Sequence, residues 1–169
     1  AHGGGTGFDF TPLAPRGEQR PGAARAEGPL RFIEAFSAAT LAPAPGAFRG
    51  GANMAVLRID HPDILEFIHA KDVPGRLSNF NLSVAVPERF LSQLQQAPDS
   101  PHLVRHPQTG EERPLLRSGA ICSAGELWEQ LCRAAHRHGE PGLFFVDRAN
   151  AADPVPGLGP IAATNPCGE

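Results

Sequence analysis

The sequence predicts an α/β fold built on a mainly parallel sheet. Short apolar segments typical of buried strands alternate along the chain with longer segments whose apolar residues recur at helical spacing. Between them lie stretches rich in glycine and proline, which number 19 and 18 in the chain and favour turns. Strands that alternate with helices are typical of parallel pairing, because a parallel strand needs a crossover connection.

Composition narrows the class of protein. The 169 residues fit one domain, and we expect residues 1–169 to be a partial domain of a longer chain, since they begin without Met and stop at Glu169. The net charge is -3 with Lys71 as the sole lysine, which excludes a broad nucleic-acid-binding face. No apolar run approaches the roughly 20 residues of a membrane span. Three irregularly spaced cysteines favour a reducing, cytoplasmic setting over a disulfide scaffold.

The first third of the chain contains a helix, a strand and a second helix. Residues 29–41 carry Pro29 in the first turn and apolar residues at helical spacing, which predicts a helix. Residues 53–59 have the pattern of a buried strand. Residues 61–71 follow with Asp63 in a first turn and an apolar helical face.

The middle of the chain contains a strand with two different faces. In residues 77–86, polar residues including Asn81 and Ser83 alternate with apolar ones, so one face of this strand should be polar and could line a cavity in a barrel. Residues 87–96 are the expected helix that follows. Residues 97–120 are a long proline-rich excursion without a predicted element.

The last third begins with a capped helix. Ser123 and Glu126 have the spacing of a capping box, which predicts a helix from Ser123 to His138, and Cys132 falls in its apolar stripe, so we place it in the core. Residues 142–147 form a short apolar strand, and residues 149–161 are a proline- and glycine-rich loop.

The glycine run at residues 3–7 is open to two interpretations. Its successive backbone amides could form an anion-binding nest beside a ligand. It is neither a Walker loop nor a dinucleotide fingerprint, so a plain flexible turn explains it as well.

The terminal stretch, residues 163–169, places three reactive groups close together. Asn165, Cys167 and Glu169 are each two residues apart, so in an extended segment they would face one ligand together. An amide, an oxidisable thiol and a carboxylic acid suit chemistry on a diol. A lone cysteine between Pro and Gly can also be a small buried residue.

No metal site is predicted. No second Cys or His lies at zinc-ligand spacing from Cys167. His61 and His69 lack a facing thiol or acidic partner at ligand spacing, and we interpret both as structural or surface residues.

Several motifs in this order resemble the class II, adenosylcobalamin-dependent ribonucleotide reductases. The terminal stretch ATNPCGE matches the family's finger-loop motif, and its Pro and Gly spacers are similar to class II. The other matching stretches are GGGTGFDF (3–10), GANM (51–54), HPDILEFIHAK (61–71), LSNFNLSV (77–84) and PGLFFVDRAN (141–150).

The resemblance implies a fold and a mechanism. The chain would be the first half of a ten-stranded α/β barrel, with the finger loop threaded through its centre. Cys167 would carry a thiyl radical formed with adenosylcobalamin and abstract the 3'-hydrogen of a ribonucleotide. Asn165 would hydrogen-bond the ribose, and Glu169 would take the 3'-hydroxyl proton. Gly5, Gly7, Thr164 and Asn165 would bind substrate, and the resulting radical would be reduced by a thioredoxin-type or other dithiol.

The resemblance also implies regulation by a deoxynucleotide effector. Residues 16–28 and 42–51 would be specificity loops, with Arg49, Gly51 and Ala52 as effector-loop residues. The second loop departs from the family pattern, since Ala44 and Pro45 replace the usual Lys and Gln. The helix at 29–41 would form the contact of a homodimer through its stripe of Leu30, Ile33 and Leu41.

Two alternatives remain. The glycine after Arg49 is similar to class I enzymes, whose large subunit needs a separate radical-generating subunit. A half barrel could also be a nucleotide-binding fragment that is inactive by itself and poorly soluble, because its open strand edges and apolar face lack their cover.

Overall fold

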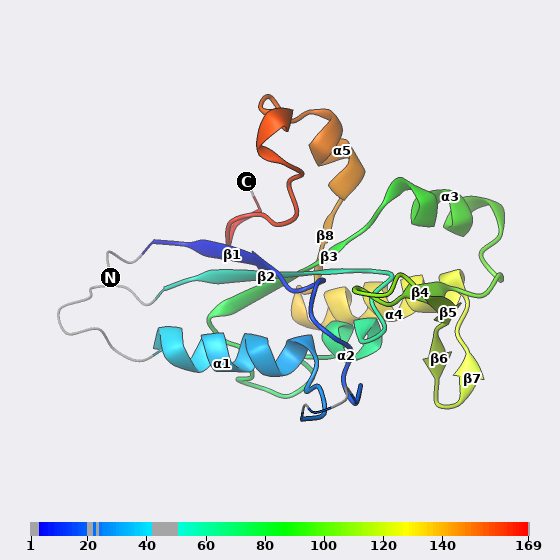
Figure 1. The fold of residues 1–169 in the computed structure, drawn as a ribbon, viewed down its shortest axis with the longest axis horizontal. Helices are drawn as coiled ribbons and strands as arrows, with labels where there is room; N and C mark the ends of the chain where they lie inside the picture. The colour runs from blue at the N-terminus through cyan, green and yellow to red at the C-terminus, as the bar shows by residue number, and fades with distance from the viewer. Residues whose placement is uncertain (1–3, 20–21, 23, 42–50, 169) are drawn as a thin grey trace.

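The computed structural model describes residues 4–19, 22, 24–41 and 51–168. Its central element is a parallel sheet with strand order β1-β2-β3-β8 (Figure 1). The strands are β1 (Thr6–Asp9), β2 (Asn53–Arg58), β3 (Phe80–Ala85) and β8 (Gly142–Phe144). The predicted parallel α/β arrangement is confirmed. A five-stranded half barrel was expected, and the described residues place four strands in this sheet.

Helices cover one side of the sheet, which we call the helix face. Figure 1 shows α1 (Pro29–Leu41), α2 (Ile64–Ile68) and α4 (Ala124–His138) below the strands. The core between them is apolar and closely packed: Ile33, Leu57, Phe67, Phe80 and Leu127 are each at most 1% exposed. Full burial of such a side chain stabilises a fold by about 1.5–3 kcal/mol, so this face supplies most of the hydrophobic stabilisation.

The other side of the sheet, the polar face, carries different residues because strand side chains alternate. Phe80 and Leu82 of β3 lie in the helix-face core, and Asn81 between them contacts the opposite side. The predicted polar face of this strand is confirmed. A small apolar cluster of Met54, Val56, Ala85 and Val146 also lies on this side.

Helix α1 has the predicted bounds, but its apolar stripe does not have the predicted role of a dimer contact. Leu30 and Ile33 are 4% and 0% exposed and belong to the core of this chain. The interpretation of these two residues as a contact with a second copy is therefore wrong. The outward apolar residues of α1 are Phe32, Phe36 and Leu41.

Helix α4 confirms the predicted caps. Ser123 accepts from the Glu126 backbone N–H, the Glu126 carboxylate accepts from the Ser123 N–H, and Gly139 ends the helix in a left-handed conformation. The core placement of Cys132 is wrong, because its side chain is exposed and Cys122 is the buried cysteine. The apolar stripe of α4 is narrower than the sequence pattern indicated.

Other elements differ from the predictions where they are short or polar. The predicted helix at 61–71 contains the five-residue α2, and α3 (Glu88–Gln96) agrees with the expected helix. The excursion at 97–120 contains two hairpins, and the predicted strand and loop around residues 145–151 include a helix. These elements are β4 (Leu103–Arg105) with β5 (Glu112–Pro114), β6 (Leu116–Arg117) with β7 (Ala120–Ile121), α5 (Val146–Ala151) and the 3-10 helix η1 (Pro156–Leu158). Strands of two or three mostly exposed residues have no usable apolar period.

None of the helices in the described ranges has the length and apolar character needed to cross a membrane.

Candidate functional site

The terminal stretch lies across the polar face of the sheet. Ala163 packs against the small apolar cluster around Met54. Farther along, Thr164 lies against Gly7 of β1 and Pro166 against Gly5. The stretch therefore runs antiparallel to β1 and carries the residues after Pro166 towards the amino-terminal end of that strand, above the sheet in Figure 1.

Gly5 and Gly7 allow this close approach because they lack side chains. A Cβ atom on Gly7 would lie 1.7 Å from the carbonyl oxygen of Thr164, and one on Gly5 would lie 2.7 Å from Cδ and Cγ of Pro166. Neither atom fits, since nonbonded atoms do not approach so closely. The glycine run thus forms a contact surface for the terminal stretch, a role that the sequence pattern did not indicate.

Asn150 of α5 holds the chain just before the terminal stretch. Its side-chain amide donates to the carbonyl oxygen of Ile161 at 2.9 Å, and its side-chain oxygen accepts from the Ile161 N–H at 2.7 Å. The same amide donates to the Val146 carbonyl at 2.8 Å. Because the side chain pairs with both backbone groups of Ile161, it sets the direction in which the chain enters the polar face.

Residues Asn165 to Gly168 form a β-turn. The Gly168 N–H donates to the carbonyl of Asn165 at 3.1 Å, and Gly168 has a φ of +83°. Asn in the first position, Pro in the second and Gly in the fourth favour a type I turn. The expected extended segment, in which Asn165 and Cys167 share a face by strand alternation, is therefore wrong. Glu169 lies outside the described residues.

The turn presents Cys167 to solvent as a free, exposed thiol. Thr164 directly precedes the turn, and its hydroxyl donates to the carbonyl of Asn165 at 3.0 Å. From the sheet below, the side-chain amide of Asn81 donates to the carbonyl of Pro166 at 2.6 Å. The result is an accessible sulfur on a turn that is supported from both β1 and β3.

The structure brings together most of the predicted substrate residues. Gly7 lies against Thr164 and Asn165, and Gly5 lies against Pro166 of the same stretch. Ala52, an expected effector residue, lies beside them, because its carbonyl accepts from the Thr6 N–H at 3.1 Å. Gly51 directly precedes it, whereas Arg49 and residues 42–50 lie outside the described part of the chain. Asn81 and Asn150 were not predicted as site residues, and only the polar alternation of β3 could have indicated Asn81.

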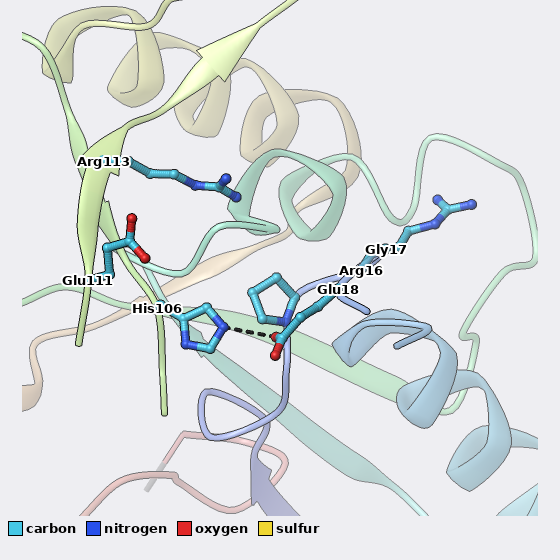
Figure 2. Close-up of a pocket in the computed structure, with 7 residues that line it drawn as sticks. Arg16, Gly17, Glu18, His106, Glu111 and Arg113 are labelled. Carbon is cyan, nitrogen blue, oxygen red and sulfur yellow. Dashed lines mark hydrogen bonds and ion pairs between the residues drawn. The ribbon is translucent and has the colours of Figure 1, made fainter. Parts of the chain in front are cut away.

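The start of the expected specificity loop 16–28 lies in a separate pocket of about 270 Å³. Figure 2 shows this pocket, where Glu18 and His106 meet at 2.8 Å. His106 Nδ1 accepts from the Thr109 N–H, so its Nε2 carries the proton that is donated to Glu18. The lining residues are Pro15, Arg16, Gly17, Glu18, His106, Glu111 and Arg113. The Glu18–His106 contact thereby ties the loop to the β4–β5 hairpin, a contact that the sequence pattern did not indicate.

Comparison with known proteins identifies the family of this chain. Residues 1–169 match the model of the ribonucleotide reductase barrel domain. The chain belongs to the ribonucleotide reductase family. The resemblance seen in the sequence motifs is thus confirmed, and the parallel sheet described above is part of a reductase barrel domain.

Several curated ribonucleotide reductases are similar over nearly the whole chain. The vitamin B12-dependent ribonucleoside-diphosphate reductase of Mycobacterium tuberculosis is 43% identical over 169 residues, which cover 99% of this chain and 23% of that protein. The enzyme of the same name from Thermoplasma acidophilum is 39% identical, with 99% and 21% covered. The vitamin B12-dependent ribonucleotide reductase of Rhodopirellula baltica is 31% identical, with 99% and 18% covered. The chain therefore spans less than a quarter of the length of these reductases.

Proposed function

We propose that this chain is part of the catalytic chain of an adenosylcobalamin-dependent ribonucleotide reductase, an enzyme that makes 2'-deoxyribonucleotides for DNA synthesis. The observation that carries the proposal is the exposed thiol of Cys167 on a turn packed against Gly5 and Gly7. The barrel-domain match and the names of the relatives support it. Because two of those names specify diphosphates, we propose ribonucleoside diphosphates as substrates.

The residues of this chain would act on the ribose in a fixed order. Cys167, as a thiyl, removes the hydrogen atom from C3' and becomes a thiol. Glu169 takes the 3'-hydroxyl proton and later returns it to the 3'-oxygen, and the 2'-hydroxyl takes a proton from the reducing dithiol and leaves as water. A dithiol of the thioredoxin type or another dithiol supplies two electrons and two protons and becomes a disulfide, and the hydrogen atom returns from Cys167 to C3'. Asn165 hydrogen-bonds the ribose, and Gly5, Gly7 and Thr164 border the substrate.

Adenosylcobalamin supplies, when bound, the carbon-centred radical that this chemistry requires. The described residues fit that group in one respect, because the Cys167 thiol is exposed at the tip of a turn and accessible from outside the sheet. Pro166 and Gly168 favour that turn and so keep the sulfur at its tip.

The remaining features of the family complete the proposal. The four-stranded sheet would belong to the first five-stranded half of a ten-stranded barrel, with the terminal stretch as its finger loop and residues 1–169 as a partial domain. Residues 16–28 and 42–51, with Arg49, Gly51 and Ala52, would respond to a deoxynucleotide effector. The enzyme would be a cytoplasmic homodimer.

The test is an assay of the full-length protein with a ribonucleoside diphosphate, a dithiol and adenosylcobalamin. We expect deoxynucleotide formation that depends on adenosylcobalamin and vanishes in Cys167→Ser, because an O–H bond is much harder to break homolytically than an S–H bond. The matched control is Cys132→Ser, which changes the other exposed cysteine and should keep turnover.

Two other results would point to the alternatives. Turnover without adenosylcobalamin, dependent on a second subunit, would indicate a class I enzyme. Nucleotide binding without turnover under every condition would indicate a nucleotide-binding module.

A further inference from the structure

Asn81 reaches from the sheet to the turn that carries Cys167. Its side-chain amide donates to the carbonyl oxygen of Pro166 at 2.6 Å, across 85 positions of sequence. The donor is held rigidly, because Asn81 lies inside β3 in register with Met54 of β2. A contact from a paired strand defines a direction more sharply than a contact from a loop does.

The carbonyl of Pro166 belongs to the central peptide of the turn. In the β-turn from Asn165 to Gly168, reversal of the peptide between the second and third residues converts type I to type II. Type II requires a positive φ at the third residue, which is Cys167. The described non-glycine residues with positive φ are Leu77 and Ser118, so Cys167 has the negative φ of type I. The direction of this one carbonyl is therefore coupled to the direction of the Cys167 side chain.

The other supports act on different atoms. Gly5 and Gly7 set how closely the stretch approaches β1, and Asn150 sets its direction at Ile161. None of these three contacts involves the carbonyl of Pro166. The contacts with Gly5, Gly7 and Asn150 leave the Pro166–Cys167 peptide free to rotate. A hydrogen-bond donor to the Pro166 carbonyl fixes that rotation.

We propose that Asn81 is a positioning residue that orients the Pro166–Cys167 peptide and thereby aims the thiol of Cys167. Its effect on catalysis rests on the proposed function, whereas its effect on the thiol's environment does not. The residue bonds to the Pro166 carbonyl and so acts through the backbone of the turn.

The test uses Asn81→Asp in the full-length protein. Aspartate has nearly the same shape but presents an acceptor to the Pro166 carbonyl, so the hydrogen bond is replaced by repulsion. Asn81→Ala, which removes the donor without adding charge, is the second variant and decides the test if the Asp variant does not fold. The matched control is Gln96→Glu, the same amide-to-carboxylate change at an exposed position on α3.

Two measurements separate positioning from general stability. The first is the rate at which iodoacetamide alkylates Cys167, followed by mass spectrometry of the peptide that carries it. We expect a severalfold change in both Asn81 variants and none in Gln96→Glu. The second is steady-state kinetics, where we expect kcat to fall on the order of tenfold with KM unchanged, because the substrate still binds while the reacting sulfur is misdirected.

Each outcome decides the proposal. An unchanged alkylation rate in the Asn81 variants overturns it, and so does an unchanged kcat in a protein that turns over. If the parent protein shows no reductase activity but the alkylation rates differ as expected, the proposed function fails and the positioning role of Asn81 stands.

Discussion

On the helix face, β3 presents Phe80, Leu82 and Val84 to packed helices, whereas on the polar face the same strand presents Asn81 to a turn. One face is stabilised by burial of large apolar side chains, which is strong and tolerant of small shifts in direction. The other face depends on glycines that allow close backbone contact and on directed hydrogen bonds. These contribute less to stability but fix the position of the terminal stretch. Stability and the placement of the thiol therefore reside on opposite faces, and mutations should separate them.

The largest effect on stability is expected from Phe80→Ala on the helix face. Phe80 is 0% exposed, and truncation of a buried phenylalanine leaves a cavity that costs about 3–5 kcal/mol of unfolding free energy. Urea denaturation of the full-length protein measures the loss. Phe32→Ala on α1, where the side chain is 47% exposed, is the control and should cost much less. Equal losses would contradict the division between the faces.

The next effect is expected from Gly7→Ala on the polar face. The added methyl group would meet the Thr164 carbonyl at 1.7 Å, so the terminal stretch must move away from β1. We expect turnover to fall on the order of 100-fold, because misplacement by about 1 Å has that effect on reacting groups. Unfolding free energy should change less than in Phe80→Ala. Gly4→Ala is the matched control, since its Cβ would have no atom within 4 Å. Equal turnover in the two variants would show that the close contact is unimportant.

Acid should affect the helix face through its buried histidines. Burial lowers the pKa of His102, and burial likewise lowers the pKa of His61. A histidine kept neutral in the folded state adds a proton on unfolding at low pH, so stability should fall as pH drops below about 6.5, the ordinary histidine pKa, towards the lowered folded values. Urea denaturation at several pH values tests this. His102→Gln should reduce the slope, while exposed His136→Gln should not; identical slopes in all three proteins would rule out the histidines as the cause.

The smallest effect is expected from Ser123→Ala at the start of α4. The change removes the capping hydrogen bond to the Glu126 N–H, and such losses typically cost about 1 kcal/mol. Because α4 packs on the helix face, thermal unfolding should shift while the alkylation rate of Cys167 stays the same. A changed alkylation rate would mean that the two faces are coupled.

Short-range patterns in the sequence predicted the helices and strands that are stabilised by contacts between residues close in the sequence. The caps of α4, the bounds of α1 and the two faces of β3 follow from spacing along one element, and the structure confirms them. The two hairpins in residues 97–121 and the helix α5 were missed, because short, exposed elements have little apolar period. Cys132 was misplaced because a stripe on a helix shows which residues can be buried, not how wide the neighbouring surface is.

The sequence by itself determined the family and the parallel α/β class, since motif order and periodicity are properties of the chain alone, and it predicted a reactive group at Cys167. Only the tertiary structure decided how that group is presented. The contacts of Gly7 with Thr164 and of Asn81 with Pro166 join residues more than 80 positions apart. Nothing in local spacing encodes such contacts, because they arise only when the terminal stretch packs across the polar face of the folded sheet.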